Sequence, residues 1–90
     1  MKIVSDQAQE LIQYIVREVI RNPELRIEED TPLVSSGIID SLALVEILQK
    51  LEDITRLRIS AGKVQPKDMD TVRLMLGTAL RVGKPSLRGN

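Results

Sequence analysis

The stretch of sequence that decides the fold runs from Ser36 to Leu51 and reads SGIIDSLALVEILQKL. Gly37 provides the backbone freedom for a break in the chain, and Asp40 is a residue type that caps helix N-termini. Apolar residues then recur at the three- and four-residue spacing of one helix face, at Leu44, Ile47, Leu48 and Leu51. The pattern predicts an amphipathic helix that begins at Asp40-Ser41 and ends near Ile54.

Two further helices are predicted on either side of this one. The first is expected from Ser5, a capping residue, to about Arg21, because Asn22-Pro23 stops it. Its apolar stripe consists of Leu11, Ile12, Ile15, Val16, Val19 and Ile20. The last helix is expected over about residues 71–82, with Asp70 as its cap. Its buried stripe is predicted to consist of Val72, Met75, Leu76, Ala79 and Leu80.

The connecting segments contain shorter signals. Thr31-Pro32 is typical of a cap and first helical position, which predicts one short helical turn. Leu57 and Ile59 alternate with polar residues, as in a short extended piece, and residues 66–69 are expected to form a brief turn. Three substantial helices plus a short one predict an all-α fold, a small four-helix bundle.

The length of the chain predicts one domain, over residues 1–82. Residues 83–90 follow the last apolar stripe and are rich in Gly, Pro and polar residues, so we expect them to form a disordered tail. The longest apolar run is far shorter than a membrane span, and the first four residues are too short for a signal peptide. We therefore expect a soluble, cytoplasmic protein without a membrane span.

Missing residue types limit the chemistry of the chain. There is no His and no Cys among its 90 residues. This excludes the commonest general base, the usual zinc ligands, a cysteine nucleophile and disulfide bonds. No nucleophile–base pair or metal cluster is visible either, so we predict neither an enzymatic activity nor a metal site.

Charge is distributed unevenly along the chain. Residues 56–90 carry 8 basic and 2 acidic side chains, a balance that is found in nucleic-acid-binding segments. The basic residues are scattered, however, and no aromatic residue lies among them, since Tyr14 is the only aromatic. The pattern favours an ordinary solvated surface, and we expect no nucleic acid partner.

Ser41 is the residue with the most distinctive local setting. Its position predicts an accessible hydroxyl in the first turn of a helix, next to a capping Asp40. An anion built there would face the positive end of the helix dipole, a placement worth about 0.3–1 kcal/mol. Leu42 lies off the apolar stripe and should be partly exposed beside Ser41. An Asp-Ser pair before an amphipathic helix is, on the other hand, often only a cap.

The motif Asp40-Ser41-Leu42, with Gly37 before it and the apolar stripe after it, resembles the attachment site of acyl and peptidyl carrier proteins. The resemblance spans roughly residues 11–80. Asp30-Thr31-Pro32-Leu33 is similar to the D-x-x-L that opens the first loop of that family, and residues 66–72 resemble the element that introduces its last helix. The run from Gly37 to Leu42 is closest in motif to stand-alone aminoacyl or D-alanyl carrier proteins.

The resemblance implies a carrier that is not itself an enzyme. A phosphopantetheinyl transferase would join 4'-phosphopantetheine from coenzyme A to the Ser41 hydroxyl, between Asp40 and Leu42. An acyl- or aminoacyl-loading ligase would charge the arm as a thioester, and downstream transferases would collect the cargo from the protein, which we expect to be a monomer. The Leu44 face of the second helix and the final helix would shelter the cargo.

The resemblance also implies a partner surface on the second helix. The residues off its core stripe are Val45, Glu46, Gln49, Glu52 and Asp53. The alternative is that they are ordinary solvated side chains. Fatty-acid carriers have denser acid on this helix, whereas Ala43, Gln49 and Lys50 dilute it here. This speaks against a role in fatty-acid synthesis, so we expect a carrier for an activated acyl or aminoacyl group, with a long-chain acyl carrier as one alternative. A helical protein-interaction module, in which Ser41 is only a cap, is the other.

Overall fold

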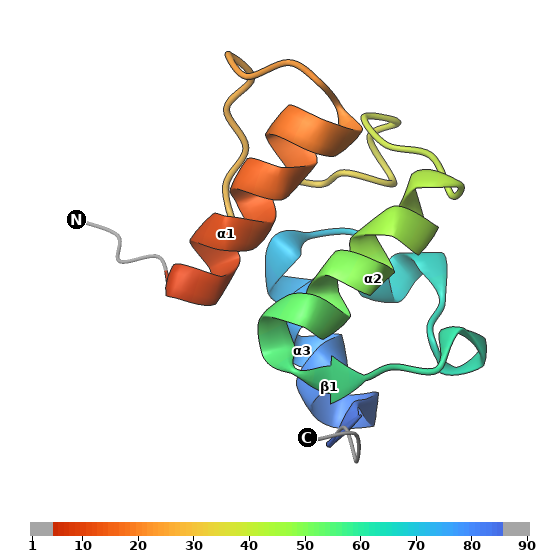
Figure 1. Ribbon diagram of the computed structural model, residues 1–90. Coiled ribbons are helices and arrows are strands. Elements are labelled where there is room, and N and C mark those ends of the chain that lie inside the picture. The colour runs from red at the N-terminus through yellow and green to blue at the C-terminus, as the bar shows by residue number, and fades with distance from the viewer. Residues whose placement is uncertain (1–4, 86–90) are drawn as a thin grey trace.

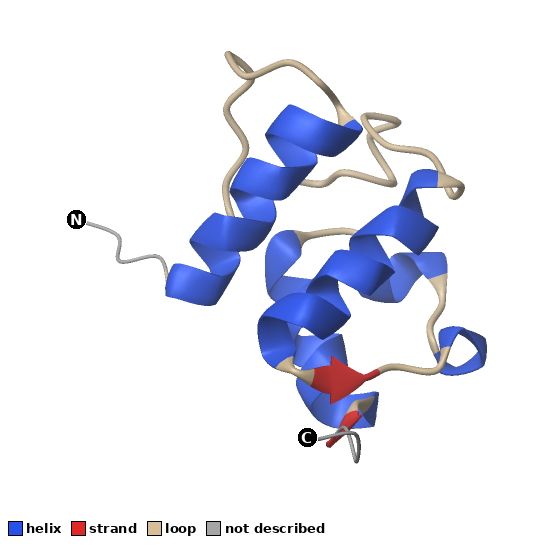
Figure 2. Ribbon diagram, in the orientation of Figure 1, coloured by secondary structure: helices blue, strands red, loops and turns tan. Residues whose placement is uncertain are grey.

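Three α-helices that pack against one another in pairs form the body of the protein (Figure 1). The computed structural model describes residues 5–85. The helices are α1 (Asp6–Tyr14), α2 (Ala43–Thr55) and α3 (Val72–Val82), and α1 continues directly into a π-helical turn, η1 (Ile15–Val19). A long loop arches from the end of η1 to the start of α2 (Figure 2). Within the described residues, no helix is both long and apolar enough to cross a membrane.

The first helix begins and packs as its sequence predicts. The Ser5 hydroxyl accepts a hydrogen bond from the Ala8 N–H, 3.1 Å away, which confirms Ser5 as the cap. Leu11, Ile15 and Val16 are buried. The helical segment ends at Val19, two residues earlier than expected, because the backbone becomes left-handed at Arg21, where φ is 62°.

The helical turn predicted at Thr31-Pro32 does not form. The Thr31 hydroxyl accepts a hydrogen bond from the Glu28 N–H upstream, 2.7 Å away, and caps no helix downstream. The chain instead makes a turn at residues 34–37, in which the Gly37 N–H donates to the Val34 carbonyl. Gly37 has a φ of 83°, a left-handed conformation that glycine adopts without a steric penalty.

The second helix begins at Ala43, later than the predicted start at Asp40-Ser41. Asp40 still acts as a cap, since its carboxylate accepts a hydrogen bond from the Ala43 N–H at 2.9 Å. The N–H groups of Leu44 and Val45 reach back only three residues, to the carbonyls of Ser41 and Leu42. Ser41 and Leu42 therefore form a tight turn that leads into the α-helix. Of its apolar stripe, Ile47 and Leu51 are fully buried, while Leu44 and Leu48 are half-buried.

The last helix corrects two predictions. Its cap is Thr71, whose hydroxyl accepts from the Leu74 N–H at 3.0 Å, and not Asp70, whose carboxylate bonds to the loop before α2. Leu80, predicted to be buried, is 77% exposed, because the inward face follows Val72, Met75 and Ala79. Thr78 is buried instead, and its hydroxyl donates to the Asp68 carbonyl.

The segment between α2 and α3 contains two short 3₁₀ turns, η2 (Ala61–Lys63) and η3 (Pro66–Met69). The turn predicted at residues 66–69 is thus confirmed as η3. The structure over residues 5–85 consists of three α-helices with short 3₁₀ and π segments, so the predicted count of four helices is not confirmed. The fold is otherwise mainly helical, as expected.

A small antiparallel sheet requires a correction to the all-α prediction and to the predicted tail. β1 (Leu57–Arg58) pairs with β2 (Lys84–Pro85), with Leu57 opposite Pro85. The extended piece expected near Leu57 is therefore present, and it pairs with Lys84 and Pro85, which the sequence predicts to lie in a disordered tail. The rest of that expected tail, residues 86–90, lies outside the described residues.

Two glycines of the C-terminal region should respond oppositely to a methyl group. A Cβ on Gly83 would fall against the Ala79 carbonyl oxygen and 2.9 Å from the Leu57 Cβ, so we expect Gly83→Ala to cost about 1–3 kcal/mol. A Cβ on Gly77, inside α3, meets nothing within 4 Å, so Gly77→Ala should stabilise by roughly 0.5–1 kcal/mol. Urea unfolding of the two variants measures the difference, and equal effects would contradict the close packing of Gly83 on β1.

Candidate functional site

Ser41 lies on the surface at the start of α2. Its side chain is exposed, and its hydroxyl makes no hydrogen bond to any of residues 5–85. Its backbone carbonyl accepts from the Leu44 N–H, which ties the residue to the first turn of the helix. The prediction of an accessible hydroxyl at a helix start is therefore confirmed, although Ser41 precedes the α-helix itself.

The residues beside Ser41 contribute to the site in different ways. The Asp40 carboxylate is held by the Ala43 N–H, so it fixes the start of the helix. Leu42 is 80% exposed and Val45 is 62% exposed, so both present apolar surface next to the hydroxyl. These two side chains, three residues apart, are among the large apolar residues that the fold leaves exposed.

A mainly apolar pocket of about 200 Å³ opens beside Ser41. The α2 side is formed by Ser41, Leu44, Val45 and Leu48, and the opposite side by Ala61, Val64, Gln65, Pro66 and Met69. The Leu44 face thus takes part in the pocket, as the resemblance implied. The final helix does not, because the segment from η2 to η3 lies in its place. The apolar residues of that segment were the sequence signal for this wall of the pocket. The prediction of an irregular connection assigned them no such role.

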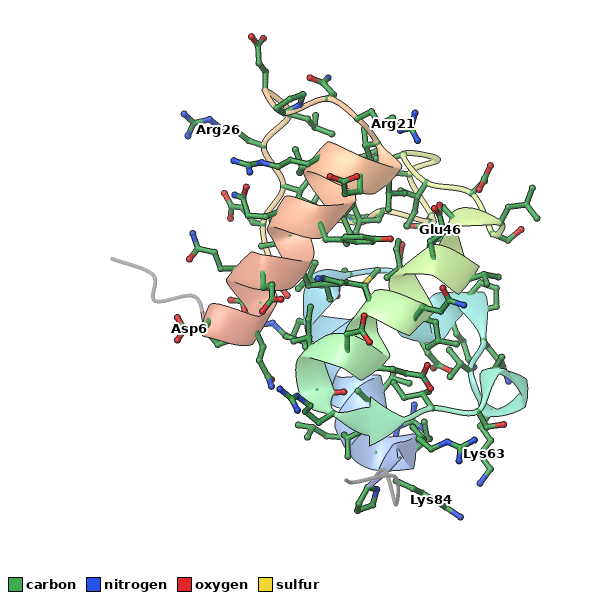
Figure 3. The ribbon with its side chains drawn as sticks, viewed as in Figure 1. Asp6, Arg21, Arg26, Glu46, Lys63 and Lys84 are labelled. Atoms are coloured by element: carbon green, nitrogen blue, oxygen red, sulfur yellow. The ribbon has the colours of Figure 1, made fainter. Side chains whose placement is uncertain are left out.

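The predicted partner residues on α2 separate into two groups. Val45, Glu46, Gln49 and Asp53 are exposed, and Figure 3 shows Glu46 on the half of α2 nearer its start. Glu52 differs, because its carboxylate accepts a hydrogen bond from the Ile59 N–H at 2.7 Å and ties α2 to the chain after β1.

Lys50 turns toward α1, with its ammonium 3.6 Å from a Glu10 carboxylate oxygen. Lys50 therefore dilutes the acidic face of α2 less than its place in the sequence suggests.

Two carboxylates fasten the loop before Ser41 to α3 and to the residue that precedes the α3 cap. Asp30 pairs with Arg73 through two hydrogen bonds, of 2.7 and 3.2 Å, and hydrogen bonding with Asp30 raises the pKa of Arg73. Asp70 accepts hydrogen bonds from the N–H groups of Leu33, Val34 and Ser35 and from the Ser35 hydroxyl. The hydrogen bonds from Ser35, first that of its backbone N–H and then that of its hydroxyl, lower the pKa of Asp70. Sequence reasoning missed this role of Asp70.

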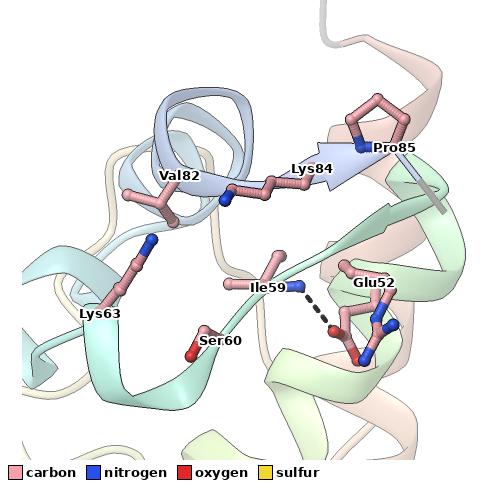
Figure 4. Close-up of a pocket in the computed structure, with 8 residues that line it drawn as sticks. Glu52, Ile59, Ser60, Lys63, Val82, Lys84 and Pro85 are labelled. Carbon is pink, nitrogen blue, oxygen red and sulfur yellow. Dashed lines mark hydrogen bonds between the residues drawn. The ribbon is translucent and has the colours of Figure 1, made fainter.

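A larger cavity, of about 640 Å³, contains neither Ser41 nor any residue of its pocket. It is lined by Glu52, Arg58, Ile59, Ser60, Lys63, Val82, Lys84 and Pro85 (Figure 4). Figure 3 places Lys63 and Lys84 at the end of the molecule away from Glu46. The one carboxylate of the lining, that of Glu52, is engaged by the Ile59 N–H. The exposed hydroxyl of Ser41 thus lies outside this larger cavity.

The comparison with protein families gives one match. The family model for the phosphopantetheine attachment site matches residues 10–77, which include the fastened loop, the Ser41 turn and the pocket beside it. Comparisons with curated proteins and with solved structures gave no significant match. Domains of this family hold 4'-phosphopantetheine covalently on a serine, and an exposed serine hydroxyl beside an apolar pocket fits that group. Because the match covers well over half of the chain, the protein belongs to the phosphopantetheine attachment site family.

Proposed function

We propose that this protein is a carrier in which the Ser41 oxygen holds the 4'-phosphopantetheine arm and an acyl or aminoacyl group rides on the arm as a thioester. The observation that carries the proposal is the exposed Ser41 hydroxyl, free of hydrogen bonds to the described residues, within a phosphopantetheine attachment domain. Such domains carry intermediates and leave the chemistry to biosynthetic enzymes, so the expected partners are a transferase that adds the arm, a loading ligase and downstream transferases.

The other serines support the choice of Ser41. The Ser35 hydroxyl donates to Asp70, the Ser36 hydroxyl donates to the Pro32 carbonyl, and the Ser5 hydroxyl caps α1. Ser60 is exposed, but it precedes a three-residue 3₁₀ turn and lines the larger cavity. Ser41 alone among these five combines exposure, an uncommitted hydroxyl and a place at the start of a long helix.

Attachment would be a displacement at phosphorus. The Ser41 oxygen would form a bond to the phosphorus that bears the pantetheine arm, and the diphosphate bond of coenzyme A would break. The serine proton would pass to the transferase or to solvent, and 3',5'-ADP would leave. The product is a phosphodiester anion, which the positive end of the α2 dipole favours by about 0.3–1 kcal/mol.

The pocket beside Ser41 supports a small cargo. Its volume of about 200 Å³ is less than the roughly 300–1,000 Å³ of common ligand pockets. An aminoacyl or short acyl group would find apolar walls in Leu44, Leu48 and Met69. A long acyl chain would have to widen the space between α2 and η3. We therefore propose an aminoacyl or short acyl cargo, and a long-chain acyl group remains the second candidate.

The exposed face of α2 is the proposed contact surface for partner enzymes. It presents the apolar Leu42 and Val45 next to the acidic Glu46 and Asp53. Charges at the rim of an interface mainly affect the rate of association and its dependence on salt. Glu52 was predicted as part of this surface, but its hydrogen bond to Ile59 supports a structural contribution instead.

Reversing two charges on α2 should slow arm transfer without unfolding the protein. We expect the double variant Glu46→Lys and Asp53→Lys to lose transfer rate at low salt and to approach the wild-type rate as salt screens the charges. Both residues are exposed, so the free energy of unfolding should change by less than about 0.5 kcal/mol. The matched control reverses Glu18 and Glu24, which are also exposed. Equal slowing by both double variants would show that net charge alone matters.

The direct test of the proposed function is arm uptake by the wild-type protein. Purified protein is incubated with coenzyme A, magnesium and a transferase of broad specificity, and its intact mass is followed. A carrier gains the mass of one arm, whereas a helical interaction module gains nothing. The intact mass of the protein isolated from its own host would show the arm and any cargo together.

A further inference from the structure

Asp70 makes an unusual number of contacts for a residue at a helix start. One carboxylate oxygen accepts from the N–H groups of Leu33, Val34 and Ser35, at 3.2, 2.8 and 2.8 Å. The other oxygen accepts from the Ser35 hydroxyl at 2.8 Å. The backbone carbonyl of Asp70 also accepts from the Leu33 N–H, at 2.7 Å. Hydrogen bonds to a charged carboxylate are stronger than those between neutral groups. A single residue next to α3 therefore holds one short segment of a distant loop.

The segment that Asp70 holds leads directly to Ser41. The Ile39 N–H donates to the Leu33 carbonyl at 3.0 Å, so the two ends of residues 33–39 are joined. The side chains of Leu33 and Ile39 are both buried and anchor this closed loop in the core. Asp40 and Ser41 follow at once, and the chain then enters α2. The position of Ser41 thus depends on α2 on one side and on the loop fastened by Asp70 on the other.

We propose that Asp70 is a positioning residue for the attachment of the arm at Ser41, a role that rests on the proposed function. Its carboxylate keeps residues 33–39 in one conformation, so that the transferase meets a Ser41 turn that is already ordered. Transfer requires the serine oxygen to lie in line with the phosphorus, and a displacement of about 1 Å can cost as much as a hundred-fold in rate. Without the carboxylate, three backbone N–H groups of the loop lose their shared acceptor, and the transferase must order the loop itself.

Two substitutions at Asp70 separate the acceptor from the charge. Asn keeps an oxygen that can accept from the N–H groups of Leu33, Val34 and Ser35, and its amide group can donate to the Ser35 oxygen. Ala removes every side-chain contact. The adjacent Thr71 supplies the matched control, because Thr71→Ala removes the cap hydrogen bond to Leu74 and leaves all Asp70 contacts in place. Asp70→Ala and Thr71→Ala both lower Tm, but only the first releases the loop.

The experiment measures kcat/KM for arm transfer to the wild type and to these three variants, at a temperature where all are folded. We expect Asp70→Ala to lower kcat/KM by about ten-fold, well within the range for a misplaced reacting group. Asp70→Asn should stay within about three-fold of the wild type, and Thr71→Ala should be close to it. Amide hydrogen exchange provides a second measurement, which does not depend on the transferase. Asp70→Ala should speed exchange at Val34, Ser35 and Ile39 while leaving the amides of α1 unchanged.

The possible outcomes distinguish this inference from the proposed function. If the wild type takes the arm and Asp70→Ala takes it equally fast, the positioning role is wrong while Ser41 attachment stands. If Thr71→Ala slows transfer as much as Asp70→Ala, loss of stability explains the effect and the inference is overturned. If the wild type takes no arm from several transferases, the proposed function fails and the role of Asp70 fails with it.

Discussion

We expect Ser41→Ala to take up no phosphopantetheine arm under conditions in which the wild-type protein gains one. The substitution removes the only oxygen that can form the phosphodiester at this position and changes little else. The Ser41 hydroxyl makes no hydrogen bond to the described residues, and its side chain is exposed. Surface substitutions of this kind usually change stability by less than about 0.5 kcal/mol. The variant should therefore keep the helical circular dichroism of the wild type.

Two control variants make this result specific. Ser60→Ala removes another exposed serine hydroxyl, and Ser36→Ala removes a hydroxyl only five residues from Ser41. Both variants should gain one arm, and peptide mapping should place it on Ser41. Ser36→Ala is expected to unfold more easily, because it loses the hydrogen bonds from its hydroxyl to the carbonyls of Pro32 and Leu33. Modification of Ser41→Ala would move the attachment to another residue and remove the basis of the proposed function.

The parts of the structure that depend on neighbouring residues could be predicted from the sequence. The Ser5 cap, the stripe through Ile47 and Leu51 and the exposed Leu42 all follow from contacts within a few residues along the chain. Helical periodicity and capping chemistry express such local contacts directly. The candidate site could be predicted for the same reason, because Asp40 and Ser41 belong to the start of the same helix.

The parts that depend on distant segments could not be predicted in this way. Asp70 and Thr71 are both capping residue types, and periodicity alone cannot tell which one caps α3 and which one bonds elsewhere. The partners of Asp70 lie 35 to 37 residues away in sequence. The pairing of Lys84 with Arg58 could not be predicted either, because a strand of two residues is too short to show a sequence pattern. These tertiary contacts decide the loop geometry, the pairing of β2 with β1 and the wall of the pocket.

The rotation of α3 about its own axis, which decides whether Leu80 or Thr78 is buried, is also hard to predict from the sequence. Leu80 and Thr78 lie on either side of Ala79, and hydrophobicity favours Leu80 as the buried one. The segment from η2 to η3 packs on the other side, however, where the Asp68 carbonyl accepts a hydrogen bond from the Thr78 hydroxyl. A buried hydroxyl with a partner costs little, so the helix can leave Leu80 exposed. An apolar stripe of marginal width therefore does not determine the rotation of a short helix.

Leu51→Ala is expected to be the most destabilising of the substitutions considered, at about 2–5 kcal/mol. Leu51 is fully buried in the core between the helices, and truncation would leave a cavity there that the surrounding side chains cannot fill. A domain of this size has a total stability of about 5–15 kcal/mol, so the variant could be partly unfolded at 37 °C.

Leu48 lies on the same stripe but is half-buried and lines the pocket beside Ser41. Leu48→Ala should therefore cost only about 1–2 kcal/mol, because it removes less apolar area from the core and opens onto an existing pocket. Urea unfolding of this matched pair decides the point, and equal losses would place Leu48 in the core and remove it from the pocket wall.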